Sequence, residues 1–181
     1  GFTDEGLAFV YHGSATGLSA TPNSVPDDAN QAFAQFGYSV ACAGDVNGDG
    51  YSDVIIGAYQ FDSGQSDEGA AFVYHGSATG IVNTFAAMVE SNQATAYFGS
   101  SVASAGDVNG DGYSDVIIGA YWYDDGFNFD EGRAFVYHGS ATGISLAPNS
   151  TPDDADLNGA QFGISVAGAG DVNGDGYSDV I

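Results

Sequence analysis

The twelve residues Gly44-Asp-Val-Asn-Gly-Asp-Gly-Tyr-Ser-Asp-Val-Ile55 decide the fold, because the same twelve recur unchanged from Gly106 and from Gly170. A second stretch, AFVYHGSATG, also occurs three times, and its copies start 63 residues apart. The two stretches alternate along the chain. Such self-similarity at a fixed period indicates a repeat architecture, here with a unit of about 63 residues.

Each unit contains four apolar runs separated by turn residues, which predict four short β-strands. The second run is rich in Val and Ile and nearly continuous, as expected for a strand that is buried on both faces. The fourth run gives the weakest signal, and its stretch 85–90 could instead hold a helical turn. In the best-defined unit the four runs, called strands A, B, C and D, cover residues 37–43, 53–59, 70–75 and 81–89.

Four antiparallel strands per unit, repeated along the chain, predict an all-β fold and, within it, a β-propeller built from four-stranded antiparallel blades. We expect about three blade equivalents in the order C-D, A-B-C-D, A-B-C-D, A-B, which form one propeller domain or part of one. Under this division residues 1–35 form a C-terminal half-blade, 36–97 and 98–161 form full blades, and 162–181 form an N-terminal half-blade.

The Asp-rich stretch between strands A and B has the donor pattern of a calcium loop. Counting from Asp45, oxygen-bearing side chains occupy positions 1, 3, 5 and 9, and Gly50 at position 6 permits a sharp turn. An EF-hand loop would place its last acidic ligand at position 12 before a helix, whereas position 12 here is Ile56 in a predicted strand. The alternative is an acidic surface turn capped by Asx hydrogen bonds, but the threefold recurrence of the whole pattern favours Ca²⁺.

Phe-Gly, the Asp-rich loop and the Gly-Ala strand end occur in an order that resembles the FG-GAP repeat of the integrin α-subunit propeller, over essentially the whole chain. The resemblance implies one Ca²⁺ in each A–B loop, about three per chain, bound by side chains at positions 1, 3, 5 and 9 and by the backbone carbonyl at position 7. Two features depart from the family: Asn replaces Asp at position 3, and three blade equivalents do not divide evenly into an integrin-like ring. The implied ligands are Asp45, Asn47, Asp49, Tyr51 and Asp53; Asp107, Asn109, Asp111, Tyr113 and Asp115; and Asp171, Asn173, Asp175, Tyr177 and Asp179.

The charge of the chain excludes two classes of function. There are 24 acidic residues against one basic residue, Arg133, and the formal net charge is −23. The chain therefore lacks the Lys and Arg contacts of a nucleic-acid binder or a polybasic membrane anchor, and no apolar stretch is long enough for membrane insertion. Calcium loops and turns account for the acidic clusters, so we expect no enzyme activity. Acidity and loops suited to millimolar calcium indicate a secreted or cell-surface location.

A comparison of the copies separates a constant end of the propeller from a varied end. The A–B loops and C–D turns are identical, whereas the B–C and D–A loops differ, so the B–C and D–A face is the expected ligand-binding face. The expected function is a calcium-stabilised adhesion module that recognises a protein or glycan. Two alternatives are a propeller part of a secreted polysaccharide-active enzyme and a purely structural surface scaffold. The candidate contact residues, unless they pack between blades, are Phe61, Trp122, Tyr123, Phe127 and Phe129.

The two half-blades are complementary, because one carries strands C and D and the other carries strands A and B. Two chains joined head to tail would share these blades and close a ring of about six blades, within the usual range for propellers. We therefore expect a homo-oligomer, with a dimer favoured. The alternative is that the chain belongs to a longer propeller polypeptide.

Overall fold

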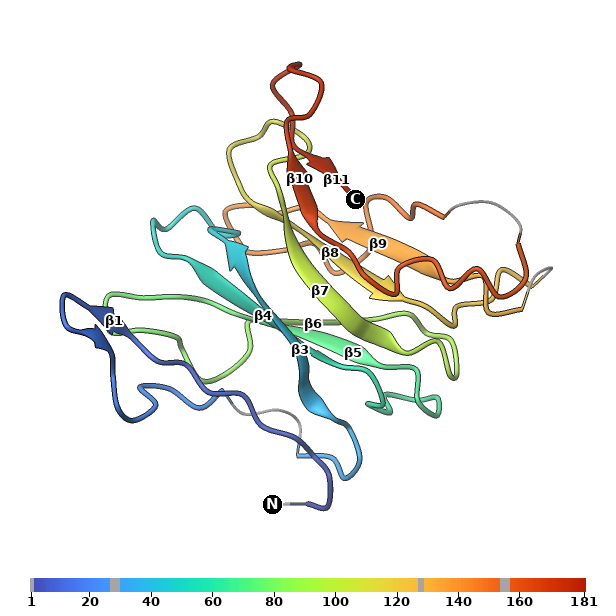
Figure 1. The fold of residues 1–181 in the computed structure, drawn as a ribbon, viewed down its shortest axis with the longest axis horizontal. Coiled ribbons are helices and arrows are strands. Elements are labelled where there is room, and N and C mark those ends of the chain that lie inside the picture. Colours follow the sequence, from blue (N-terminus) through green and yellow to red (C-terminus); the bar gives the residue numbers. More distant parts are fainter. Residues whose placement is uncertain (1, 27–29, 127–128, 154–156) are drawn as a thin grey trace.

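The first complete blade reproduces the predicted order of strands. The computed structural model describes residues 2–26, 30–126, 129–153 and 157–181. Its four-stranded antiparallel sheet consists of β3 (Phe36–Gly44), β4 (Asp53–Ala58), β5 (Ala70–Tyr74) and β6 (Ala87–Glu90), in that order (Figure 1). Strand β6 replaces the alternative of a helical turn at 85–90. The described residues form no helix that could cross a membrane.

The second blade has three regular strands and an irregular fourth one. Strands β7 (Phe98–Gly106), β8 (Asp115–Ala120) and β9 (Arg133–Tyr137) form the sheet. At the fourth position Val136 N donates a hydrogen bond to Ser150 O at 2.8 Å, and one isolated bridge replaces a ladder. Pro148 and Pro152 border this segment, and a proline has no amide hydrogen for a ladder. The stretch that forms β6 contains no proline, so it can pair regularly.

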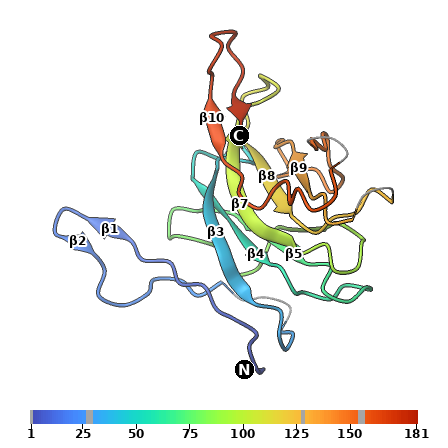
Figure 2. The same cartoon turned by 45° about the vertical axis from the view of Figure 1, so that its right-hand side comes forward.

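Two partial sheets flank the blades. Near the N-terminus, β1 (Gly13–Ser14) and β2 (Gly17–Leu18) form a short hairpin that stands apart from the blade sheets in Figure 2. Near the C-terminus, β10 (Gly168–Gly170) pairs with β11 (Asp179–Val180). The arrangement is an all-β succession of antiparallel sheets. The number of blades in a closed ring stays a prediction.

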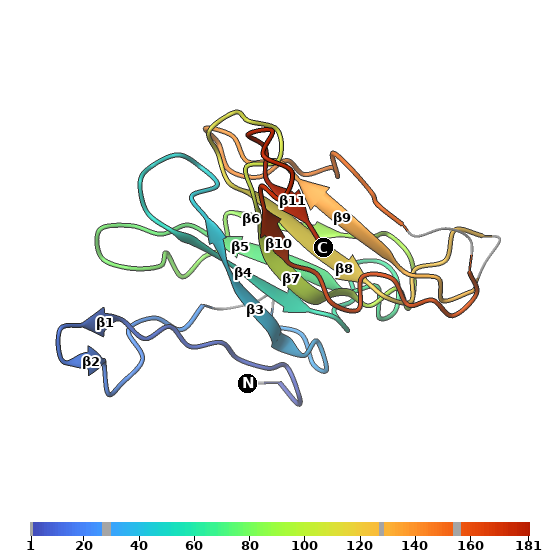
Figure 3. The ribbon, with the colours of Figure 1, turned by 45° about the horizontal axis from the view of Figure 1, so that its top comes forward.

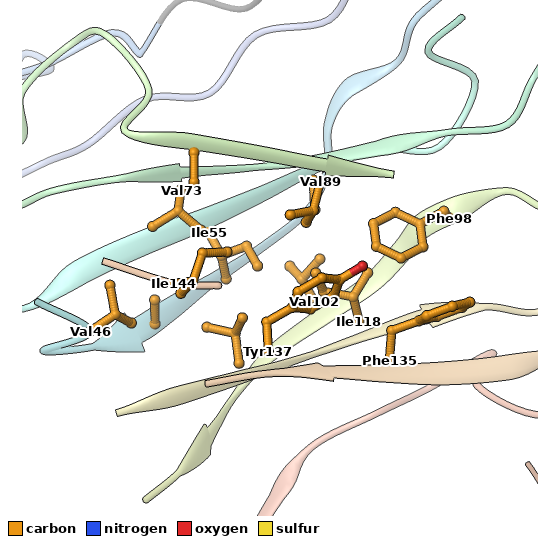
Figure 4. Packing of buried hydrophobic residues seen from close by; sticks show 14 of the residues in the cluster. Val46, Ile55, Val73, Val89, Phe98, Val102, Ile118, Phe135, Tyr137 and Ile144 are labelled. Carbon is orange, nitrogen blue, oxygen red and sulfur yellow. The ribbon is translucent and has the colours of Figure 1, made fainter. Parts of the chain in front are cut away.

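The main core lies between the two blades. Ile55 and Val89 of the first blade face Phe98 and Tyr137 of the second in Figure 4, and all four are buried. Ile56, the neighbour of Ile55, is buried in a separate cluster on the other side of the first blade. Strand β4 is therefore buried on both faces, which confirms the prediction from its continuous Val/Ile run.

Glycines at the ends of the B strands allow the blades to approach closely. A Cβ atom added to Gly57 would lie 1.9 Å from the carbonyl oxygen of Gly99, and one added to Gly119 would lie 1.8 Å from that of Gly163. No side chain fits such a gap, because the neighbouring atom belongs to the backbone. The Gly-Ala end of one blade and the Phe-Gly pair of the next are thus two halves of a single inter-blade contact.

Candidate functional site

Three Asp-rich loops project from the same end of the sheets (Figure 3). They comprise residues 45–52, 107–114 and 171–178, each between a strand A and a strand B, and are called the Asp loops below. The B–C and D–A connections leave the opposite ends of the strands. The constant and varied loops of the sequence therefore lie on different faces.

Inside each Asp loop the backbone winds around the carboxylate of the first Asp. Gly48 N donates to Asp45 Oδ1 at 2.7 Å, and Gly50 N donates to Asp45 Oδ2 at 2.8 Å. Asp49 N donates to Asn47 Oδ1 at 3.0 Å, and Asn47 Nδ2 donates to Asp49 Oδ2 at 3.0 Å. The same bonds recur at nearly the same distances in the second and third loops. The side chains at positions 1, 3 and 5 are thus held together by local hydrogen bonds.

The Asp at position 9 fastens the loop to its own blade. The fully buried Asp53 accepts a hydrogen bond from Val46 N on Oδ2 at 2.9 Å and one from Gly76 N on Oδ1 at 2.7 Å. Gly76 belongs to the C–D turn, 23 residues after Asp53, so one carboxylate joins the Asp loop to the C–D turn of the same blade. Asp115 makes the equivalent pair with Val108 N and Gly139 N. Among the described residues, Asp179 accepts only the bond from Val172 N, at 2.8 Å.

The environments of these carboxyl groups shift their pKa values in two directions. Burial raises the pKa of Asp53 and Asp115, although the backbone amides bonded to each carboxylate oppose the shift. The Tyr113 amide, and then the Asn109 side chain, lower the pKa of Asp111. The Gly176 amide in the same way lowers the pKa of Asp171. The carboxylates of Asp111 and Asp171 are therefore ionised at neutral pH, as cation binding requires.

The donor chemistry of the Asp loops fits a hard divalent cation. Each loop offers oxygen donors alone, chiefly carboxylate, amide and backbone carbonyl oxygens, which are the ligand class of Ca²⁺, and it holds no imidazole or thiolate. Over the described ranges no three Asp, Glu, His or Cys side chains gather as a ready metal site. In the first loop both carboxylate oxygens of Asp53 accept hydrogen bonds from backbone amides, those of Val46 and Gly76. We expect positions 1, 3, 5 and 7 to supply the first ligands, with Asp53 and its counterparts using their remaining lone pairs.

The candidate contact residues on the varied face divide into buried and exposed ones. Phe61 is 5% exposed and packs edge-on against Phe72, with ring centroids 5.4 Å apart, so its assignment to a contact surface is corrected to a core role. Tyr123 is partly buried against Phe135 and under the Arg133 guanidinium. Phe129 is 74% exposed. Trp122 is partly exposed, and Phe127 lies outside the described residues.

Sequence reasoning missed a row of aromatic rings on this face. Tyr38 lies against Tyr59 at 4.4 Å between ring centroids, and Tyr59 against Tyr97 at 5.3 Å. Tyr97 in turn contacts Tyr121 and Trp122, at 5.7 and 4.8 Å. Desolvation raises the pKa of Tyr59, Tyr97 and Tyr121, so these hydroxyls stay protonated well into alkaline pH. The signal for the row was the Tyr that follows the Gly-Ala strand end in both complete blades.

Comparison with known proteins agrees with this arrangement. The family model described as FG-GAP repeat matches residues 36–74 and 98–137, which are the A–C strands of the two blades with their Asp loops. Human integrin alpha-6 is 36% identical over 155 residues, 84% of this chain and 13% of the integrin. Chicken (Gallus gallus) integrin alpha-6 is 34% identical over 80% of the chain and 13% of its own length, and mouse integrin alpha-7 is 34% identical over 81% and 12%.

These matches confirm the predicted family and, with it, a non-enzymatic β-propeller module. The chain spans about one eighth of the length of these integrin relatives, so the likeness concerns their FG-GAP region. The close contact between Phe-Gly and Gly-Ala and the repeated Asp loops are the features that carry it in this structure. The chain contains FG-GAP repeats at residues 36–74 and 98–137 and, over most of its length, is similar to part of the integrin α-subunits.

Proposed function

We propose that the chain is a calcium-stabilised, extracellular adhesion-type module. The observation that carries the proposal is the Asp loop, in which hydrogen bonds hold three oxygen-bearing side chains together in each of three copies. A bound cation would supply the positive charge that these oxygens lack. The side chains at positions 1, 3 and 5 hold the loop around that charge, and the Asp at position 9 joins it to the blade.

Calcium at extracellular concentration suits such loops. Because position 3 is Asn, each loop brings three carboxylates, at positions 1, 5 and 9. Against one divalent ion these leave a small negative charge, which favours moderate affinity. An ion that binds the folded state alone stabilises it by mass action, by about 2.7 kcal/mol per site at a calcium concentration of 100 times Kd. We therefore expect removal of calcium to lower the melting temperature.

Thermal melting in EDTA and after addition of calcium tests the proposal. Wild type should melt at a lower temperature in EDTA, and calcium should restore the difference more effectively than magnesium. Asp49→Ala, which removes a side chain at position 5, should lose part of the calcium-dependent gain. In EDTA this variant and wild type should melt at nearly the same temperature, because Asp49 is exposed. Equal melting of wild type in EDTA and in calcium would reject the stabilising role.

The proposed binding face is the varied one, with a protein or a glycan as ligand. Support comes from the exposed Phe129 and from the partly exposed Trp122 at the end of the tyrosine row. Trp122→Ala should weaken binding to whichever protein or glycan is retained on an array. Tyr51→Ala is the matched control, because Tyr51 is an exposed ring on the Asp-loop face. If no ligand is retained, or if both variants bind like wild type, the proposed ligand-binding function is replaced by that of a purely structural surface scaffold.

Further blades are proposed to cover the open sides of the partial sheets. Leu7 and Phe9 are half exposed, and Val40 of β3 is 60% exposed; together they line an apolar groove of about 610 Å³. A second copy of the chain or a longer polypeptide could supply these blades. Light scattering of the 181-residue chain separates the two: a mass near twice 18.4 kDa supports the dimer, and a monomer rejects it.

A further inference from the structure

Reciprocal backbone and hydroxyl bonds connect each Asp loop to the next across the blade boundary. Asp45 N donates to Ser114 Oγ at 3.2 Å, and Ser114 N donates to Asp45 O at 3.0 Å. Asp107 and Ser178 repeat the pair at 3.2 and 2.9 Å. The Ser at position 8 of one loop thus holds the first Asp of the preceding loop from both sides. The contact occurs at both boundaries between successive Asp loops.

An aromatic contact accompanies each of these hydrogen-bond pairs. The ring of Tyr113 lies on Gly48, where an added Cβ would be 2.6 Å from Cε1, and Tyr177 lies on Gly110 in the same way at 2.7 Å. Gly48 also has a φ of +73°, which disfavours any other residue. Position 7 of one loop therefore covers position 4 of the preceding loop, and both loops must keep their shape for the contact to form.

A second route passes through the C–D turn of the second blade. Ser140 N donates to Val46 O at 3.0 Å, so this turn is bonded to the first Asp loop. The adjacent Gly139 N donates to Asp115 Oδ1 at 2.8 Å, so the turn is also bonded to position 9 of the second loop. Two contiguous sets of hydrogen bonds therefore join the residues that border the two predicted cation sites.

We propose that cation binding is positively coupled between adjacent Asp loops. The inference rests on the proposed function, since it requires that the loops bind calcium. Ser114 lies between Tyr113 and Asp115, two predicted ligands of the second loop, and bonds to Asp45, the first ligand of the preceding loop. A cation that fixes either loop therefore orders the bonding partner of the other, and by linkage the effect is reciprocal. Filling one loop also removes negative charge beside the next, an opposing effect that salt screens.

The size of the coupling follows from the hydrogen bonds between adjacent Asp loops, which form fully only when both loops are ordered. A hydrogen bond contributes on the order of a fivefold change in an equilibrium constant. A fivefold coupling between two like sites corresponds to a Hill coefficient of about 1.4. Calcium titration by calorimetry at physiological salt measures both the affinity and this coefficient.

Two matched substitutions compare a pair of adjacent loops with a pair that is not adjacent. Asp49→Ala disables the first loop and leaves two adjacent loops, whereas Asp111→Ala disables the second and leaves two that are not adjacent. Both variants lose the same position-5 side chain and the same charge. We expect a Hill coefficient above one for Asp49→Ala and a coefficient of one for Asp111→Ala. Equal coefficients in the two variants would overturn the coupling while leaving calcium binding intact.

A hydroxyl substitution tests the route. In an Asp175→Ala background, which keeps only the first two loops, Ser114→Ala should reduce the Hill coefficient towards one and weaken the affinity up to about fivefold. Ser52→Ala is the control, because Ser52 occupies the same loop position and its hydroxyl has no bonding partner among the described residues. Equal effects of the two substitutions would overturn the route through Ser114. An absence of calcium binding by wild type would instead reject the proposed function, and the coupling with it.

Discussion

Replacing Asp53 by Ala should unfold the protein at a much lower temperature even when no metal is present. Asp53 is fully buried, and its two carboxylate oxygens satisfy the amides of Val46 and Gly76, which lie in buried backbone. Without the carboxylate both buried amides lose their hydrogen-bond acceptor. Each buried amide left unsatisfied costs about 1–3 kcal/mol, so the variant should lose roughly 3–5 kcal/mol of unfolding free energy.

The same position in the third Asp loop offers a matched control. Asp179 is partly exposed and accepts one described hydrogen bond, from Val172 N, so Asp179→Ala should cost only about 1 kcal/mol. Asp53→Asn keeps the shape but turns an NH₂ group towards one amide, and should fall between the two. For a domain of this size a loss of 3–5 kcal/mol lowers the melting temperature by roughly 6–15 °C.

The assay is thermal and urea unfolding followed by circular dichroism, with EDTA in every sample. The chelator removes any contribution of Asp53 as a metal ligand, so the measured loss reports only its hydrogen bonds. If Asp53→Ala costs no more than Asp179→Ala under these conditions, the scaffolding role of Asp53 is wrong.

Two further predictions concern packing and alkaline pH. Gly57→Ala should lower the free energy of unfolding in urea by roughly 1–3 kcal/mol, because the new Cβ would lie 1.9 Å from a backbone oxygen of the next blade. Gly13→Ala is the control and should cost little, because its Cβ meets nothing within 4 Å. Equal losses in the two variants would contradict the inter-blade role of Gly57. Desolvation raises the pKa of Tyr59, Tyr97, Tyr121 and Tyr137 above the ordinary 10.0, so the unfolded chain releases these protons first and stability is lost as pH rises above about 10. Absorbance of tyrosinate against pH should show these rings ionising later than the exposed tyrosines, and the buried Tyr137 last. Ionisation of every ring near the ordinary value in folded protein would contradict this.

The repeat and its strands could be predicted from sequence because the signals are local. The Val/Ile run of β4 and the turn glycines on either side of it depend on neighbours a few residues away. The proline pair near the end of the second blade is equally local, although four regular strands were expected there. The Asp loop was also readable, since the hydrogen bonds among its positions 1 to 7 join residues at most five apart.

The roles that depend on contacts between residues distant in the sequence could not be predicted. The burial of Phe61 depends on Phe72, with which it shares the core on one side of the first blade. The role of Asp53 in joining the Asp loop to the C–D turn depends on Gly76. The hydrogen bond between Asp45 and Ser114 joins residues 69 positions apart. No periodicity of the sequence shows such partners, because those of Phe61 and Asp53 lie elsewhere in the same blade and that of Asp45 lies in the next blade.

Calcium stoichiometry tests the central claim most directly. Equilibrium dialysis of the 181-residue chain against millimolar calcium, followed by elemental analysis, should find about three ions per chain, one for each Asp loop. Asp49→Ala, Asp111→Ala and Asp175→Ala should each remove one ion and keep the fold. The absence of bound calcium in wild type, or the same stoichiometry in all three variants, would contradict the assignment of the Asp loops as calcium sites.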